Sequence, residues 1–174
     1  MQQMVIYGVS FDMVGKQPIV LLKTADGNKF LPIWIGHPEA TAILMKLQGA
    51  ATPRPMTHDL LSDVIAHLEA KVVRIAVTEL RDNTFYALIT VAVDGTEIEI
   101  DSRPSDAIAL AVRADAPIFA ADAVIEESAI EFEHDDEAGE ETPEDALPGP
   151  PLPSIEEFKK FLDEVKPEDF SVES

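Results

Sequence analysis

Apolar and polar residues alternate along several short stretches of the chain, which is the pattern of half-buried β-strands. The stretches are residues 4–10, 19–23, 29–35, 72–80, 84–93 and 97–101, with a shorter run at 117–119. Asp26-Gly27 and Asp94-Gly95 each separate two of these runs, and such dipeptides favour the tight turn of a β-hairpin. The pattern therefore predicts mostly antiparallel strands.

Three other stretches repeat their apolar residues at the spacing of an α-helix. The first begins at Pro38 and stops at Gly49, the second begins with Thr57 as its cap, and the third spans residues 104–114. In the second helix the expected buried stripe consists of Leu60, Leu61, Val64, Ile65 and Leu68. The third is rich in alanine and apolar almost all round, which predicts a buried helix. One or two more helical turns are expected before Ile130.

The first part of the chain has a weak echo in the second, at an offset of 65 residues. Residues 33–35 and 42–43 correspond to residues 98–100 and 107–108. In both places a strand and an Asp-Gly hairpin precede these residues. One interpretation is a β-β-β-α duplication, and the other is a chance match of short apolar patterns. Either interpretation predicts an α+β fold in which helices pack on mostly antiparallel strands.

Acidic residues and prolines gather toward the C-terminal end of the 174 residues. Residues 1–125 hold 15 acidic and 10 basic residues, whereas residues 126–174 hold 18 and 3. We expect one domain at 1–131, followed by a disordered acidic and proline-rich linker at 132–153 that buries too little apolar surface to fold. Residues 154–166 form a capping-box sequence and an apolar stripe, which predicts a short amphipathic helix before a tail at 167–174.

The composition excludes several classes of protein. The chain has no cysteine, which excludes disulfide scaffolds, thiol nucleophiles and cysteine-ligated zinc. A net charge of −20 excludes the simplest nucleic-acid-binding protein with a uniformly basic face, although the mildly acidic first 125 residues leave room for a local basic patch. The sequence shows no signal-peptide pattern and no apolar run near the ~20 residues of a membrane helix. We therefore expect a cytoplasmic protein that does not bind membranes.

Four stretches combine apolar residues with unusual polar ones in a fixed order along the chain. They are LPIWIGHPEATAI (31–43), RPMTHDLL (54–61), TFYALI (84–89) and IDSRPSDAIALAVR (100–113). With these stretches the chain resembles the bifunctional nuclease domain family, formerly a domain of unknown function, over about residues 4–128. The resemblance implies a nuclease that acts on DNA and RNA. It implies no settled catalytic mechanism, so the roles of individual residues rest on their own chemistry.

Most polar residues of these stretches lie at the predicted helix starts or in the loops before them. They are Glu39, Arg54, Thr57, His58, Asp59, Arg103, Ser105 and Asp106. Helix N-termini present free N–H groups and the positive end of the helix dipole, which suit phosphate oxygens. Arg54, Arg103 and Ser105 are therefore candidate phosphate-binding residues, because guanidinium groups bind phosphate bidentately.

Hydrolysis of a phosphodiester also needs an activated water and neutralisation of the charge that develops on the phosphate. Carboxylates that hold a divalent metal ion, Mg²⁺ or Mn²⁺, supply both, and Glu39, Asp59 and Asp106 are the candidate ligands. His58, Asp59 and Asp106 form the candidate catalytic set, with His58 as a ligand or a general base. No spacing of a known metal motif such as HExxH supports this assignment.

The same residues also have structural interpretations. Residues 57–59 fit a helix cap followed by an acid in the first turn. Arg103 and Asp106, three positions apart, fit a salt bridge that orders the loop. Glu39 suits an acid that compensates a helix dipole.

Two functions remain open on the sequence alone. The first is a metal-assisted nuclease with low sequence specificity and with DNA and RNA as substrates. The second is a non-catalytic regulatory or adaptor module that uses the polar helix starts, with residues 154–166 recruiting a partner protein. A homodimer is expected in either case because of exposed strand edges and the all-round apolar helix.

Overall fold

A computed structural model describes residues 1–11 and 17–131. The described part holds the strands β1 (Gln2–Phe11), β2 (Pro18–Thr24), β3 (Lys29–Trp34), β4 (Lys71–Arg81), β5 (Thr84–Val93), β6 (Thr96–Ser102), β7 (Ile118–Ala120) and β8 (Ile130–Glu131). Its helices are α1 (His37–Leu47), α2 (Thr57–His67), α3 (Pro104–Ala114) and α4 (Asp122–Ser128). Residues 1–131 form one compact unit. The predicted linker at 132–153, helix at 154–166 and tail at 167–174 lie outside the described residues.

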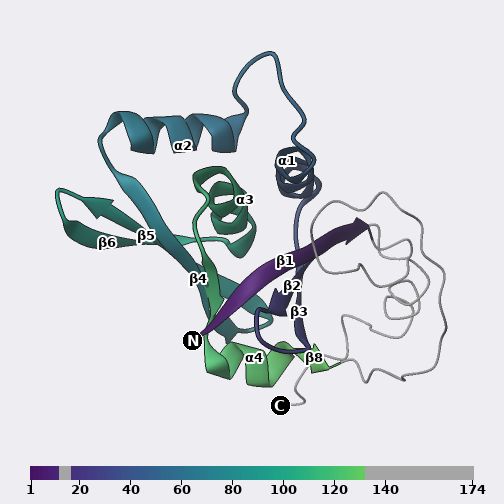
Figure 1. Cartoon of the computed structure of the whole chain (residues 1–174). Coiled ribbons are helices and arrows are strands. Elements are labelled where there is room, and N and C mark those ends of the chain that lie inside the picture. The colour runs from purple at the N-terminus through teal and green to yellow at the C-terminus, as the bar shows by residue number, and fades with distance from the viewer. Residues whose placement is uncertain (12–16, 132–174) are drawn as a thin grey trace. The chain divides into compact units, whose positions relative to one another are not determined.

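The strands form one sheet in the order β6-β5-β4-β7-β1-β2-β3-β8 (Figure 1). Every neighbouring pair is antiparallel except β4 and β7, which are parallel. The predicted α+β fold is therefore confirmed. Both Asp-Gly turns lie where the sequence places them, between β2 and β3 and between β5 and β6.

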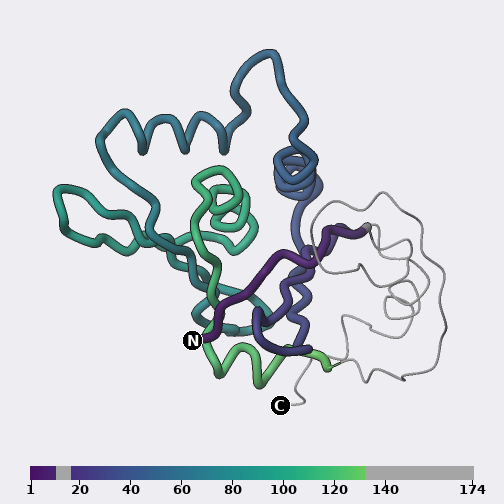
Figure 2. The backbone as a smooth tube through the Cα atoms, in the orientation of Figure 1, coloured from purple at the N-terminus to yellow at the C-terminus, as the bar shows by residue number. Residues whose placement is uncertain are grey.

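The order β-β-β-α occurs twice, as the sequence echo suggests. Strands β1 to β3 form an antiparallel meander that leads into α1, and β4 to β6 form another that leads into α3 (Figure 2). We call residues 2–47 the first half and residues 71–114 the second half. Strand β7 lies between β1 and β4 and pairs with both, so it joins the halves into one sheet.

The core lies between the sheet and the helices α1 and α3, which also contact each other. Ile43 of α1 and Ile108 of α3 are fully buried. Helix α3 buries most of its length, including three of its four alanines, which confirms the prediction for this helix. Because alanine side chains are small, they let α3 lie close to its neighbours.

The predicted core and the observed core differ at helix α2. Of its expected stripe, Leu60, Leu61, Val64 and Leu68 are 57%, 40%, 46% and 70% exposed. Only Ile65 packs against the core, as a partly buried residue, and the buried residue of the helix is His58. The predicted buried stripe is therefore wrong, because α2 turns a more polar side toward α3.

The end of the described part returns to the first half. After β7 and α4, the two-residue strand β8 pairs with β3 and closes that edge of the sheet. The sequence predicts β7 and the helical turns, but two residues carry no periodicity that would reveal β8. At the opposite edge, no described residue pairs with the outer side of β6. Among the described helices, none is long and apolar enough to cross a bilayer.

Candidate functional site at three helix starts

The same local arrangement opens three of the helices, namely an acidic residue three positions after the N-cap. The N-cap and the acid are Gly36 and Glu39 in α1, Met56 and Asp59 in α2, and Arg103 and Asp106 in α3. A carboxylate at this position faces free backbone N–H groups and the positive end of the helix dipole. Each of the three acids also contacts an arginine, which makes the helix starts into a polar region of the structure.

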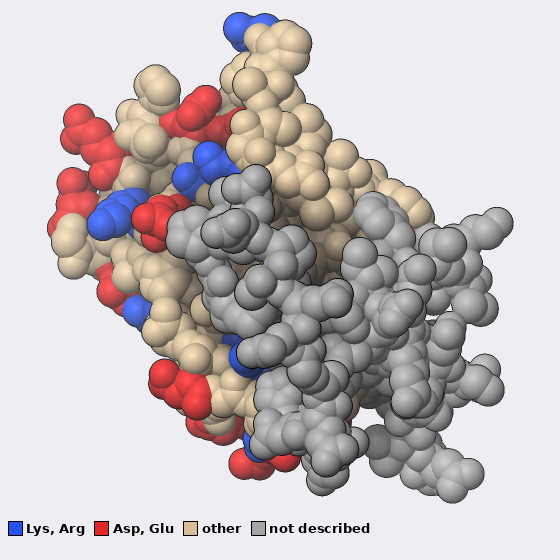
Figure 3. Space-filling view, turned by 45° about the vertical axis from the view of Figure 1, so that its right-hand side comes forward, with Lys and Arg blue, Asp and Glu red and all other residues tan. Residues whose placement is uncertain are grey.

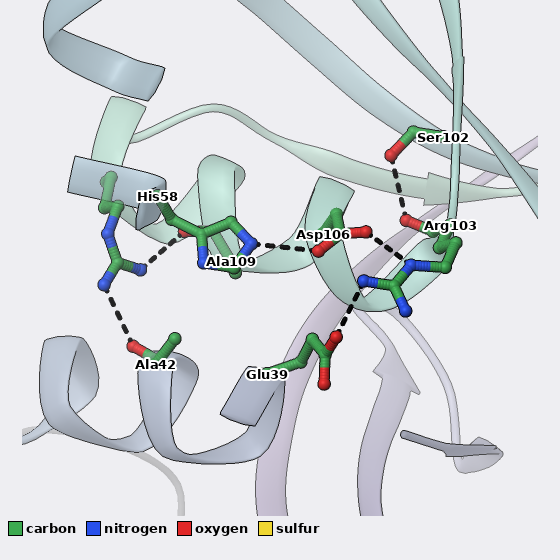
Figure 4. A network of polar contacts seen from close by, with 8 residues as sticks. Glu39, Ala42, His58, Ser102, Arg103, Asp106 and Ala109 are labelled. Carbon is green, nitrogen blue, oxygen red and sulfur yellow. Dashed lines mark hydrogen bonds and ion pairs between the residues drawn. The ribbon is translucent and has the colours of Figure 1, made fainter. Parts of the chain in front are cut away.

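Arg103 lies at the centre of the first set of contacts (Figure 4). Its Nη2 donates to Oε1 of Glu39 at 2.7 Å, and its Nε donates to Oδ2 of Asp106 at 2.7 Å. The predicted salt bridge between Arg103 and Asp106 is thus present, and it continues to α1. The Arg103 side chain is 67% exposed, whereas that of Glu39 is 13% exposed. The guanidinium group is therefore accessible to a ligand although it has two carboxylate partners.

The position of the Glu39 carboxylate depends on Gly36, the residue before α1. A Cβ atom at residue 36 would overlap Oε2 of Glu39. Glycine at this position leaves the space into which the carboxylate folds back. The conformation of Gly36 is extended, with φ −76° and ψ 156°, so the requirement concerns space and not backbone strain.

His58, which lies on α2, also contacts Asp106. Its Nε2 lies 3.0 Å from Oδ1 of Asp106, and the side chains are 11% and 29% exposed. A carboxylate only accepts hydrogen bonds, so the neutral ring places its proton on Nε2 and its lone pair on Nδ1. No described residue forms a hydrogen bond with Nδ1. Asp106 therefore fixes both the orientation and the tautomer of His58.

The electrostatics of these residues follow from the contacts. Burial acts to raise the pKa of Asp106, but the hydrogen bonds from Arg103 and His58 outweigh it and hold the pKa below its usual value. The hydrogen bond to Asp106, followed by that to Glu39, raises the pKa of Arg103. Asp106 is therefore an anion and Arg103 a cation throughout the physiological range.

Asp59 takes part in a second set of contacts, centred on Arg113 of α3. Nε of Arg113 donates to Oδ1 of Asp59 at 2.6 Å, and Oδ2 accepts the backbone N–H of Met56 at 2.9 Å. Arg113 also donates from Nη1 to the Ala109 carbonyl at 2.8 Å and from Nη2 to the Ala42 carbonyl at 3.1 Å. The Met56 hydrogen bond lowers the pKa of Asp59 most, and Arg113 adds to this against the effect of burial.

Arg113 is a residue that the sequence analysis missed. Its side chain is only 4% exposed, and through Asp59 and Ala42 it ties α2 and α1 to α3. A signal was available, because Arg113 ends the IDSRPSDAIALAVR stretch as the one basic residue within a helix predicted to be buried. A buried charge needs a partner, and Asp59 is that partner here.

The other predicted residues lie apart from these contacts. Ser105 is buried, with 6% exposure, which leaves its hydroxyl little surface for a phosphate. Arg54 is exposed in the loop before α2, and its guanidinium has no partner among the described residues. Thr57 is the first residue of α2 and not its cap, because Met56 occupies that position and Asp59 accepts its N–H.

The predicted metal ligands do not fit a preformed metal site in this arrangement. The carboxylates of Glu39 and Asp106 both bind Arg103, and that of Asp59 binds Arg113. Within residues 1–11 and 17–131, no group of three or more histidine, aspartate or glutamate side chains is close enough to hold a metal ion. The expectation of Mg²⁺ or Mn²⁺ stays a prediction from the sequence.

The surface in Figure 3 shows how charges are distributed over one face. On its described residues, the lysine and arginine side chains alternate with aspartate and glutamate at close range. No continuous basic patch is visible among the described residues of this face. Binding of a polyanion would therefore depend on a few specific cations rather than on a broad positive field.

Comparison with known proteins identifies the class to which this α+β fold and its polar helix starts belong. The model of the family described as "Bifunctional nuclease domain" matches residues 20–133, more than half of the chain. The chain therefore belongs to the bifunctional nuclease domain family, as its motifs predict.

Two relatives show how the similarity is distributed. The "Uncharacterized protein Rv1829" of Mycobacterium tuberculosis strain H37Rv is 38% identical over 167 residues, which are 95% of each chain. "Bifunctional nuclease 1" of Oryza sativa subsp. indica is 29% identical over 103 residues, which are 57% of this chain and 31% of the rice protein. Similarity to the mycobacterial protein thus extends along nearly the whole chain, whereas similarity to the rice protein covers a part of each.

Proposed function

We propose that this protein is a nuclease that hydrolyses phosphodiester bonds of DNA and RNA with low sequence specificity. The proposed active site is the helix-start cluster, which consists of Glu39, His58, Arg103 and Asp106. The observation that carries the proposal is a histidine oriented by an aspartate that also binds an exposed arginine. Membership of the family, and the name of the rice relative, give the same reaction class.

Arg103 is the proposed ligand of the scissile phosphate. A guanidinium group has five N–H bonds, and the contacts with Glu39 and Asp106 use two of them. The remaining donors suit the non-bridging oxygens of a phosphate, whose charge grows as the reaction proceeds. Because two carboxylates offset the charge of Arg103, the substrate needs a second cation, and Arg54 in the exposed loop before α2 is the proposed one.

His58 is the proposed general base. Its Nδ1 takes a proton from a water molecule, the water oxygen bonds to phosphorus, and the ester bond to the leaving oxygen breaks. The leaving oxygen then receives a proton from the imidazolium or from solvent. Asp106 stabilises the imidazolium as it forms, since its carboxylate lies 3.0 Å from Nε2.

The test is cleavage of a supercoiled plasmid and a labelled RNA by repurified protein, with matched pairs of variants. His58→Gln is compared with His67→Gln, an exposed histidine on the same helix whose Nδ1 contacts the Asp63 carbonyl. We expect the His58 variant to lose about 10²–10⁴-fold in rate and the His67 variant to keep it.

The second pair is Arg103→Gln and Arg74→Gln. Arg74 also lies between two carboxylates, with Nη1 3.2 Å from Glu97 and Nη2 3.9 Å from Glu99, but on the sheet. We expect only Arg103→Gln to lose activity. Equal cleavage by all preparations would assign the activity to a contaminant or another site, and no cleavage by any would favour the adaptor function. Addition of EDTA to the wild type tests the metal prediction separately.

A further inference from the structure

The three acidic side chains at the starts of α1, α2 and α3 are each held by an arginine. Arg103 binds Glu39 and Asp106 at 2.7 Å each. Arg113 binds Asp59 at 2.6 Å. Charge-assisted contacts of this length are among the stronger hydrogen bonds in proteins, and a divalent metal ion would have to compete with an arginine at each of the three carboxylates. The arrangement therefore favours a reaction whose base needs no metal ion.

His58 is a base of this kind. Asp106 holds the proton of the neutral ring on Nε2, at 3.0 Å, and Nδ1 keeps its lone pair with no hydrogen bond to a described residue. Nε of Arg103 contacts the other oxygen of the same carboxylate at 2.7 Å. The proposed base and the proposed phosphate ligand thus flank one carboxylate (Figure 4). A nucleophile that belongs to the substrate itself is therefore brought toward His58 when the phosphate binds Arg103.

RNA and DNA offer such a site different nucleophiles. RNA carries a 2′-hydroxyl next to each phosphate, so its attack on phosphorus is intramolecular, whereas DNA lacks this group. Well-oriented intramolecular groups reach effective molarities of about 10⁵–10⁸ M. Cleavage of DNA needs a separate water molecule that the site must bind and orient, and the helix-start acids that could do so already bind arginines. A single histidine base beside a phosphate ligand therefore suits RNA better than DNA.

We propose that the helix-start cluster cleaves RNA by transesterification, with the 2′-hydroxyl as the nucleophile and without a metal ion. This inference rests on the proposed function, because it assigns the nucleophile and the preferred substrate of the same site. Nδ1 of His58 takes the proton of the 2′-hydroxyl, the 2′-oxygen bonds to phosphorus, and the bond between phosphorus and the 5′-oxygen breaks. The 5′-oxygen receives a proton from solvent, and the imidazolium returns its proton to solvent. The products are a 2′,3′-cyclic phosphate and a 5′-hydroxyl.

The charges that develop in this step meet partners that are already in place. Negative charge grows on the phosphate, where the N–H donors of Arg103 not used by carboxylates bind its oxygens. Positive charge forms on His58, whose Nε2 lies 3.0 Å from the carboxylate of Asp106. These contacts serve water and the 2′-hydroxyl alike, so the advantage of RNA comes from its tethered nucleophile. We expect RNA to react at least about 10³-fold faster than DNA.

A DNA oligonucleotide with a single ribonucleotide tests the nucleophile, because one of its phosphates alone has a neighbouring 2′-hydroxyl. With the full chain in EDTA, we expect cleavage only on the 3′ side of the ribonucleotide. Mass spectrometry should find a cyclic phosphate, or the 3′-phosphate from its hydrolysis, on one fragment and a 5′-hydroxyl on the other. The same oligonucleotide as all DNA, or with a 2′-O-methyl group on the ribonucleotide, should react at least about 10³-fold more slowly.

Two histidine variants show whether the helix-start cluster makes this cut. His58→Gln is expected to lose about 10²–10⁴-fold in the rate of cleavage at the ribonucleotide. His67→Gln, which changes an exposed histidine of the same helix, is the matched control and is expected to keep the rate. Melting temperatures show whether both variants are folded, and the products of the wild type test the nucleophile without either. Equal cleavage by all three preparations would identify a contaminating ribonuclease and overturn the proposal.

The products separate this inference from the proposed function. A 5′-phosphate on the second fragment, equal cleavage of the 2′-O-methyl oligonucleotide, or loss of cleavage in EDTA would overturn the transesterification. Each of these results would leave the nuclease function standing, because a phosphodiester is still hydrolysed when Mg²⁺ is present. No cleavage of this substrate or of a supercoiled plasmid, with or without Mg²⁺, would overturn both.

Discussion

The two β-β-β-α halves place one sequence pattern in two different surroundings. Ile33 and Ile35 of the first half are 2% and 4% exposed. Ile98 and Ile100, which follow them by 65 residues, are 48% and 47% exposed. The same alternation of residues therefore forms core in one half and open surface in the other.

The difference comes from the position of each strand in the sheet. In the first half, β8 pairs with β3, and α4 contacts it as well. In the second half, β6 forms the other edge, and no described element pairs with its outer side. The helices lack this asymmetry, because α1 and α3 lie against each other and against the sheet. A strand pattern thus tells which residues share a face, and the neighbours decide whether that face is covered.

The largest effect is expected from Arg113→Met, which removes a buried polar contact between the halves. Arg113 belongs to the second half, and its Nη2 binds the Ala42 carbonyl of the first. Its removal leaves Asp59 without its ion pair and the Ala42 carbonyl without this donor, at a cost of about 4 kcal/mol in the free energy of unfolding. Urea denaturation measures this cost. Arg74→Met, which removes a more exposed ion pair, is the control and should cost about 0–1 kcal/mol.

A smaller effect is expected from the two isoleucines that correspond in the halves. Ile33→Ala creates a cavity in the core and should cost about 3 kcal/mol in the free energy of unfolding. Ile98→Ala removes a half-exposed side chain, so its cost within one chain should be under about 1 kcal/mol. Urea titrations of both variants at low protein concentration compare the two costs. Equal costs would mean that β6 is covered within a single chain and would contradict the comparison.

The sequence predicts the sheet well because its signals are local. The period-two runs and the Asp-Gly turns locate β1 to β7 within a few residues, and the alanine-rich stretch locates α3 with the bounds 104–114. Helix α2 was predicted as a helix but with the wrong buried side. Its rotation is set by His58 and Asp59, whose partners lie 48 and 54 residues away. No local pattern contains that information.

The candidate site shows the same limit. Helix starts and family motifs identify Glu39, His58, Arg103 and Asp106, which the fold brings into contact. The helix starts and motifs do not show that Asp59 of α2 contacts Arg113, since this contact depends on how the three helices α1, α2 and α3 pack.

The smallest effect concerns pH and tests the polar links between the helices. The pKa of Asp59 is lowered in the folded chain by the Met56 N–H and by Arg113, so the folded state binds its proton less readily than the unfolded state. The resulting stability is fully present above the unfolded pKa of about 3.9 and is lost as the pH falls through the folded value. Asp59→Asn should therefore melt below the wild type at pH 7, and the difference in melting temperature should begin to shrink as the pH falls below about 4. Asp63→Asn, on the exposed side of the same helix, should follow the wild type throughout. If Asp59→Asn also follows it, the charge of Asp59 adds nothing to stability, and α2 is held against α3 by its other contacts.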